Sequence, residues 1–201
     1  MNATIATPQS VDSLSYHLTN KQVDNSSYRT TLKIGAPIIV QIAWYFTNII
    51  FFKNPFNILS SIKVALLRAF GAEVGKGVVI KPAVNIKYPW KLRIGDHSWI
   101  GEEVWIDNLS TVVIGSNVTI SQGGLILTGT HDHTRTTFDF LSYPIYLDNG
   151  VWIGAKAVVF GGVTCGTHSI LGMNSVAERN LERYTIYKGN PAVPVSTRKI
   201  Q

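Results

Sequence analysis

The amino-acid sequence predicts an all-β solenoid, in which a parallel β-helix follows a helical lead-in. Three observations predict this fold. Aliphatic residues recur at every sixth position over long stretches between Val74 and Ala177, groups of three such positions repeat after twenty residues, and glycine often follows the repeated aliphatic residue. A period of six fits neither an amphipathic helix nor an alternating strand, but it fits a chain that turns a corner every six residues. Three sides then make one coil.

The repeat falls into two blocks. The first contains Val74, Ile80, Ile86, Ile94, Ile100, Ile106, Ile114, Ile120 and Ile126, and the second contains Leu147, Ile153, Val159, Cys165, Leu171 and Ala177. We expect each of these side chains to point toward the axis of a triangular prism, as the one buried residue of its side, and successive coils to pair as parallel strands. The two extra residues of a twenty-residue coil should bulge at one corner. Cys165 is expected to pack in the core, not to act as a nucleophile.

The chain divides into four parts. Residues 1–27 are rich in Ser, Thr and Asn and lack the basic start and apolar core of a secretion signal, so we expect a flexible tail. Residues 28–72 form an apolar helical segment, the β-helix is expected over residues 73–181, and residues 182–201 form a C-terminal extension. An excursion loop at residues 128–146 interrupts the repeat, and a long excursion from a rigid scaffold is a common place for function.

The helical segment contains an uncharged stretch from Ile34 to Phe52. This stretch is barely long enough to cross a membrane, and Gly, Pro, Gln and Asn residues interrupt it. We expect a helix that is buried on its own domain or at a subunit interface, while peripheral attachment to a membrane and a true span are the alternatives.

A second helix is expected after Pro55, capping one end of the core. Its predicted apolar stripe consists of Phe56, Leu59, Ile62, Leu66 and Phe70, with Lys63 and Arg68 off the stripe.

Charge and cysteine content limit the function classes. Eighteen basic against twelve acidic residues leave a net charge of +6, which suits an anionic ligand such as a phosphorylated cofactor. The basic residues are scattered and form no nucleic-acid-binding signature, so no nucleic-acid partner is expected. A single cysteine excludes an internal disulfide and a cysteine-based zinc cluster within one chain. A reducing, cytoplasmic location fits best, with peripheral contact at the inner membrane as the alternative.

Several motifs resemble the hexapeptide-repeat acetyltransferases. They are the aliphatic-Gly hexads, the segments Thr128-Gly-Thr-His-Asp-His133 and Asn149-Gly-Val-Trp-Ile-Gly-Ala155, and the ending Gly189-Asn-Pro-Ala-Val193. The resemblance covers residues 73–195 and extends to the galactoside, maltose and nodulation-factor O-acetyltransferases. The lead-in from Leu66 to Gly75, together with Trp105-Ile-Asp-Asn108, is similar to the acetyltransferases of colanic-acid and other exopolysaccharide clusters.

The resemblance implies a left-handed parallel β-helix that forms a homotrimer, with active sites between neighbouring prisms. It implies that acetyl-CoA donates the acetyl group directly to a hydroxyl of a sugar or lipid-linked saccharide, in exopolysaccharide or surface-glycan synthesis, and that no metal is required. By its place in the motif, His131 is the implied general base. Histidine titrates near neutral pH, so it can take the proton of the attacking alcohol and release it afterwards.

The resemblance also implies roles for further residues. His133 would orient the base or bind the acceptor, unless it is an ordinary surface histidine, and Asp107 and Asn108 would bind the acceptor, unless they only stabilise a turn. Trp152 would pack against the pantetheine arm of the cofactor, unless it is an aromatic residue of a subunit interface. The remaining cofactor contacts implied are Ala155, Met173, Ser175, Arg179, Arg198 and Lys199. The last two replace a basic residue that relatives often carry where this chain has Val193.

Two other functions compete with this interpretation. A γ-class carbonic anhydrase shares the helix and binds zinc through three histidines. His131 and His133 could supply two ligands, but no third histidine occupies a matching coil position. A structural or ice-binding β-solenoid would need regular rows of Thr on a flat face, and the excursion loop and irregular faces argue against it.

Overall fold

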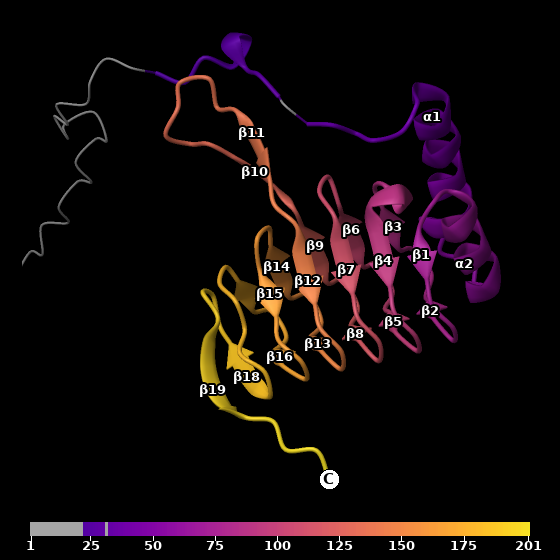
Figure 1. Cartoon of the computed structure of the whole chain (residues 1–201), viewed down its shortest axis with the longest axis vertical. Coiled ribbons are helices and arrows are strands. Elements are labelled where there is room, and N and C mark those ends of the chain that lie inside the picture. The colour runs from indigo at the N-terminus through magenta and orange to yellow at the C-terminus, as the bar shows by residue number, and fades with distance from the viewer. Residues whose placement is uncertain (1–21, 31) are drawn as a thin grey trace, which may run out of the picture.

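A computed structural model of the chain describes residues 22–30 and 32–201 (Figure 1). Residues 1–21 of the tail expected at residues 1–27 lie outside the described residues. The described chain forms a parallel β-solenoid with helices at one end and an antiparallel hairpin at the other.

Three sheets form the sides of the prism. The first contains β1 (Glu73–Val74), β4 (Leu92–Ile94), β7 (Val112–Ile114), β12 (Ile145–Leu147) and β15 (Thr164–Cys165). The second contains β2 (Val79–Ile80), β5 (Trp99–Ile100), β8 (Thr119–Ile120), β13 (Trp152–Ile153), β16 (Ile170–Leu171), β18 (Thr185–Lys188) and β19 (Val193–Thr197). The third contains β3 (Asn85–Ile86), β6 (Trp105–Asp107), β9 (Leu125–Leu127), β14 (Val158–Phe160) and β17 (Val176–Ala177). All pairings within these sheets are parallel except that of β18 with β19.

The strand register confirms the predicted repeat. Ile80 pairs with Ile100 and Ile100 with Ile120, so each coil advances by twenty residues before the excursion. Of the fifteen predicted inward residues, all but the partly buried Val74 are at most 3% exposed. Each side also buries the residue two positions earlier, such as Val118 and Ser169, so the expectation of one buried residue per side is wrong. Two inward side chains on each side are needed because one alone would leave the interior of the prism incompletely packed.

The glycines after the repeated aliphatic residues allow the coils to stack closely. A Cβ built on Gly154 would lie 2.5 Å from the backbone nitrogen of Met173 in the next coil, which is closer than a carbon atom can come. Glycine is therefore required there by the spacing of the coils. The residues with a left-handed backbone conformation are not these glycines. They include Asn117 and Lys156, whose φ angles are 57° and 56°.

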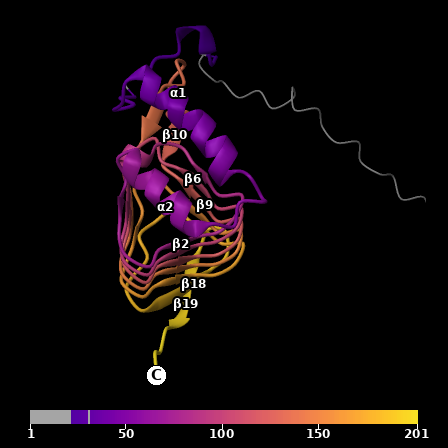
Figure 2. The same ribbon diagram turned by 90° about the vertical axis from the view of Figure 1, so that its right-hand side faces the viewer.

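Helices cover the open end of the first coil (Figure 2). They are α1 (Ile38–Thr47), a π-helical continuation at Asn48–Phe52 and α2 (Ser60–Ala69), and short 3₁₀ turns occur at Asn25–Ser27 and Pro89–Lys91. The Trp44 ring lies 5.1 Å from the rings of Phe52 and Phe70, and its indole N–H donates to the Ile86 carbonyl at 3.0 Å. The predicted capping role of the second helix is confirmed.

The stripe predicted for the second helix is partly wrong. Phe56 precedes the helix, and Phe56, Leu59 and Ile62 are exposed, whereas Leu67 and Lys63 are fully buried. The reason lies in the edge of the first coil, whose backbone groups have no preceding strand to bond with. The Lys63 ammonium donates to the Lys81 carbonyl at 2.7 Å, and burial lowers the pKa of Lys63.

Other helical side chains cap the same edge. The Ser60 hydroxyl accepts from the Ile80 N–H at 2.7 Å, and the Arg68 guanidinium donates to the Val74 carbonyl at 2.8 Å. Hydrogen bonding to an exposed strand edge therefore decided the orientation of α2, together with apolar burial.

The apolar stretch at residues 34–52 packs one face on the solenoid. Its outer face exposes Ile38, Ile39, Ile42, Phe46 and Ile50. Within residues 22–30 and 32–201, no helix combines the length and the apolar character that crossing a membrane demands.

Candidate active site

The excursion loop carries an antiparallel hairpin formed by β10 (Gly129–His131) and β11 (Phe140–Ser142). The chain leaves the third sheet at β9 and re-enters the first sheet at β12, so the hairpin projects from the corner between these sheets (Figure 1). The two extra residues of the earlier coils lie at the same corner, because Ile86 and Ile94 are eight residues apart. His131, at the end of β10, therefore extends beyond the body of the prism.

The imidazole of His131 is held by the opposite arm of the hairpin. Its Nδ1 lies 3.0 Å from the main-chain oxygen of Phe138. A carbonyl can only accept, so this geometry assigns the proton to Nδ1 and leaves the lone pair on Nε2. The neutral ring is thus in the tautomer that a general base needs.

Aromatic rings fix the orientation of this imidazole. The Phe138 ring stacks on it at 4.4 Å with an interplanar angle of 4°, and the Phe140 ring meets it edge-on at 5.6 Å. The Tyr28 ring approaches to 6.0 Å from the N-terminal segment. Phe138 has a φ of 47°, a left-handed conformation that costs a bulky residue roughly 1–3 kcal/mol. This strained residue supplies both the carbonyl and the stacking ring, and the sequence motif did not reveal it.

Charged residues stabilise the turn of the hairpin. Arg135 lies 3.2 Å from the carboxylate of Asp132 and 3.6 Å from that of Asp139. Hydrogen bonds from Thr134 lower the pKa of Asp132. His133 is exposed here, and its side chain hydrogen-bonds to none of the described residues. The structure thus distinguishes the two neighbouring histidines, since only the His131 ring is oriented by contacts.

Asp107 and Asn108 lie at the end of β6. Asn108 is completely buried, and its amide accepts from the Tyr88 N–H at 3.0 Å and donates to the Tyr88 carbonyl. This pattern fits the turn-stabilising alternative. Asp107 is 7% exposed, and its Oδ1 is buried without a hydrogen-bond partner among the described residues, 3.5 Å from the Lys87 ammonium. The Oδ1 of Asp107 therefore faces the Lys87 ammonium in the interior, and its predicted contact with the acceptor stays a prediction.

A groove of about 680 Å³ runs along a different corner, between the second and third sheets. We call it the corner groove. It brings together four of the predicted cofactor contacts, namely Trp152, Ala155, Met173 and Ser175. The indole N–H of Trp152 donates to the Ser121 hydroxyl at 2.9 Å, so the ring is oriented although it is 45% exposed.

The basic residues near the groove match the expected set only in part. Arg198 lies beside Trp152 in a smaller cavity, and its guanidinium donates to the carbonyls of Gly150 and His168 at 2.8 and 3.2 Å. Arg179 and Lys199 are exposed and do not line the corner groove. Lys188 does line it and was missed, although it directly precedes the Gly-Asn-Pro segment that the sequence analysis singled out.

Within one chain, His131 and the corner groove lie at different corners of the prism. The hairpin emerges where the third sheet leads to the first, whereas the groove lies where the second sheet leads to the third. One subunit therefore does not bring the imidazole and the groove together.

Two further expectations concern reactive and metal-binding groups. Cys165 is fully buried, and burial raises the pKa of its thiol to about 12, so it packs in the core as predicted. Among the described residues, no group of three or more His, Cys, Asp or Glu side chains is placed to hold a metal ion.

Comparison with known proteins adds relatives and similar folds, although no family model matches the chain. A protein of Escherichia coli (strain K12) that is named colanic acid biosynthesis acetyltransferase WcaF is 38% identical to this chain over 164 residues. The matched residues span 82% of this chain and 90% of that protein. The galactoside O-acetyltransferase of the same strain is 31% identical over 130 residues, which span 63% of this chain and 64% of the relative.

Two solved structures share the fold. A hexapeptide-repeat acetyltransferase of Vibrio cholerae in complex with acetyl-CoA superposes with a TM-score of 0.71 at 23% identity, over 81% of this chain and 88% of that one. A galactoside acetyltransferase in complex with coenzyme A gives a TM-score of 0.70 at 22% identity, over 80% and 82%.

Proposed function

Because the chain belongs to the hexapeptide-repeat acetyltransferase family, we propose that this acyltransferase moves an acetyl group from acetyl-CoA to a sugar hydroxyl, in the synthesis of an exopolysaccharide or surface glycan. One observation carries the proposal above the others. The Nδ1 of His131, on a projecting hairpin, lies 3.0 Å from the Phe138 carbonyl oxygen, so the neutral imidazole has its lone pair on Nε2.

His131 acts as the general base in this proposal. Its Nε2 accepts the proton of the sugar hydroxyl while the hydroxyl oxygen attacks the thioester carbon, and the same proton then passes to the departing sulfur. Acetyl-CoA brings an already activated acyl group, so the protein needs no covalent intermediate. The Phe138 carbonyl stabilises the transient imidazolium, because a hydrogen bond from a charged donor is stronger than one from a neutral donor.

The corner groove is the proposed donor site. Trp152 and Met173 give it apolar surface suited to a pantetheine arm, and backbone around Ala155 offers hydrogen-bonding groups. Lys188 in the groove and Arg198 beside Trp152 supply positive charge for the phosphates of the cofactor. Arg179 and Lys199 stay weaker candidates for this role because they lie outside the groove.

The active enzyme is proposed to be a homotrimer of left-handed prisms. His131 and the corner groove lie at different corners, so a neighbouring chain has to bring one to the other. The prism also exposes large outward side chains, among them Trp99, Trp105 and Tyr146, which a subunit interface would cover.

A complementation experiment tests this shared site. His131→Ala chains keep an intact groove, and Ala155→Trp chains have a blocked groove but an intact base. When the two inactive variants are co-expressed in equal amounts, random assembly pairs an intact base with an intact groove in about a quarter of the sites. About a quarter of wild-type turnover is therefore expected. No recovery in mixed oligomers confirmed by mass spectrometry contradicts a shared site.

The acceptor is proposed to be a saccharide that can be lipid-linked. His133 is exposed and is a candidate contact for the acceptor, whereas the buried Oδ1 of Asp107 is ion-paired with Lys87 and would have to exchange this partner to bind a hydroxyl. Helix α1, which exposes apolar side chains, and the hairpin with His131 lie toward the same side of the prism (Figures 1 and 2). Peripheral contact of α1 with the cytoplasmic membrane surface would bring the base close to a lipid-linked acceptor.

The direct test measures the release of the coenzyme A thiol from acetyl-CoA by the purified protein. Nucleotide sugars, free oligosaccharides and lipid-linked glycans serve as acceptors, and mass spectrometry locates the added acetyl group. The expected result is acceptor-dependent release with acetyl on a hydroxyl oxygen. Acetylation only of amines, or release that no saccharide stimulates, contradicts the proposal.

A further inference from the structure

The N-terminal segment before α1 lies along the hairpin that carries His131. We call its described residues, 22–30 and 32–33, the strap. The Asp24 N–H donates to the Thr136 carbonyl at 2.8 Å, and Thr30 forms a parallel bridge with Phe140 of β11. At the other end, the Lys91 ammonium donates to the Lys33 carbonyl at 2.6 Å. The strap is thus attached both to the hairpin and to the body of the prism.

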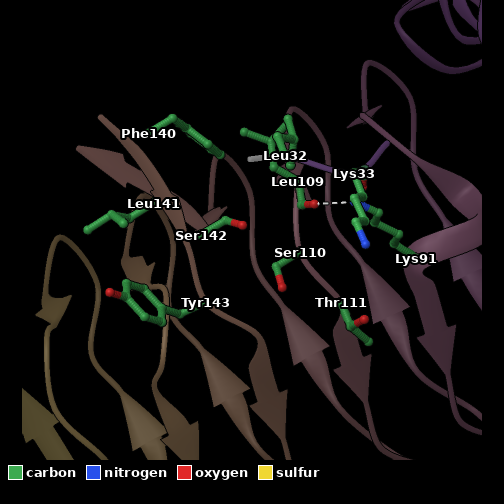
Figure 3. A pocket seen from close by; sticks show the side chains of 10 residues that line it. All are labelled: Leu32, Lys33, Lys91, Leu109, Ser110, Thr111, Phe140, Leu141, Ser142 and Tyr143. Carbon is green, nitrogen blue, oxygen red and sulfur yellow. Dashed lines mark hydrogen bonds between the residues drawn. The ribbon is translucent and has the colours of Figure 1, made fainter. Parts of the chain in front are cut away.

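A cavity of about 390 Å³ lies between the strap, β11 and the segment at residues 109–111 (Figure 3). Leu32 and Lys33 form the strap side, and Figure 3 shows Phe140, Ser142 and Lys91 directed into the space from other sides, whereas Leu141 and Tyr143 point away. Its volume is within the range of about 300–1,000 Å³ that is usual for small-molecule sites.

The cavity adjoins the proposed base without containing it. The Phe140 ring lines the cavity and also lies 5.6 Å from the imidazole of His131, which is not among the lining residues. A molecule in the cavity is therefore separated from the imidazole by one aromatic ring. Such a place suits a part of the acceptor next to the reacting hydroxyl rather than the reacting unit itself.

The chemistry of the lining selects the kind of ligand. The hydroxyls of Ser110 and Ser142 can donate and accept, and the Lys91 ammonium uses two of its three donors on the carbonyls of Lys33 and Leu109, which leaves one. Leu109, Leu32 and Phe140 add apolar surface. No carboxylate is among the described lining residues. Hydroxyl partners beside an apolar patch match a sugar ring, which has polar edges and apolar C–H faces.

We infer that this strap cavity is a saccharide subsite, which holds the sugar unit adjacent to the one that is acetylated. The inference rests on the proposed function for the identity of the reacting unit. Ser142 and Ser110 bind ring hydroxyls, Lys91 donates to a further oxygen, and Phe140 packs against the sugar face. The enzyme accordingly prefers an acceptor of two or more units over a monosaccharide.

The test measures saccharide binding to the full-length protein without acetyl-CoA, by saturation-transfer NMR. The probes are glucose, galactose, N-acetylglucosamine and their β-linked disaccharides. Wild-type protein is expected to bind at least one disaccharide more tightly than its monosaccharide. Ser142→Leu, which fills the cavity and removes a hydroxyl, is expected to weaken disaccharide binding at least tenfold. Ser110→Ala removes one hydroxyl without added bulk, and a loss of about 2- to 10-fold is expected.

Ser61→Leu is the matched control, because Ser61 is exposed on α2 and is not among the residues that line the cavity. It should bind like the wild type. The inference is overturned if the wild type binds none of the disaccharides, or if both Ser142→Leu and Ser110→Ala bind them unchanged. Because acetyl-CoA is absent, disaccharide binding by a protein that never acetylates a sugar contradicts only the proposed function. If both variants acetylate the sugar as well as the wild type does, only the subsite is contradicted.

Discussion

Replacing His131 with alanine should greatly lower kcat while it leaves the fold of the hairpin largely intact. The substitution removes the lone pair on Nε2 and one hydrogen bond to the Phe138 carbonyl. Loss of a general base costs about 100- to 10,000-fold in kcat. The lost hydrogen bond and ring contacts together are worth about 1–2 kcal/mol, which corresponds to a fall of about 2–8 °C in Tm for a chain of this size. A folded but nearly inactive enzyme is therefore expected.

The assay combines steady-state kinetics with binding. Thiol release gives kcat, isothermal titration gives the Kd of acetyl-CoA, and a thermal melt gives Tm. The Kd should change by no more than about threefold, because His131 is not among the residues that line the corner groove. His133→Ala is the matched control, since His133 is exposed on the same hairpin. It should cost about tenfold or less in kcat.

Two results would refute this reasoning. Near-normal turnover of His131→Ala in a properly assembled protein would place the base elsewhere. A larger loss for His133→Ala than for His131→Ala would show that the oriented imidazole is not the reacting one.

Two further predictions concern pH and the membrane. Burial raises the pKa of Cys165 to about 12 in the folded state from an ordinary value of 9.0, so the unfolded chain releases this proton first and stability falls as pH rises between these values. At pH 10 the thiol should lower the free energy of unfolding by about 1.4 kcal/mol relative to pH 8. Chemical denaturation should show that the free energy of unfolding of Cys165→Ala falls by about 1.4 kcal/mol less than that of the wild type between these two pH values. An equal fall in both proteins would contradict the prediction. Ile42→Glu, on the exposed face of α1, should reduce flotation with anionic lipid vesicles, whereas Ile200→Glu, exposed in the C-terminal segment, should not. Equal flotation of the two variants would argue against a membrane-facing α1.

The position of His131, the proposed general base, was predictable from the sequence, whereas the contacts that orient its ring were not. The break in the six-residue period located the excursion, and the Thr-Gly-Thr-His motif singled out His131. No pattern in the sequence pointed to Phe138, because its role depends on a left-handed backbone and on a turn that brings it back across the hairpin. The contact of the Tyr28 ring with His131 was equally hidden, since more than a hundred residues separate them.

The sequence by itself determined the solenoid and its core. A side chain that points inward every six residues leaves a periodic record in the chain, because each side of the prism repeats the same local geometry. Residues without such a period could not be placed in this way. Lys63 looked like a surface residue beside an apolar stripe, yet it is buried because the open edge of the first coil needs a donor for the Lys81 carbonyl. The separation of His131 from the corner groove, and the strap cavity beside the hairpin, likewise arise from which corner each segment occupies. Corner positions are set by contacts between distant segments, and only the tertiary structure decides them.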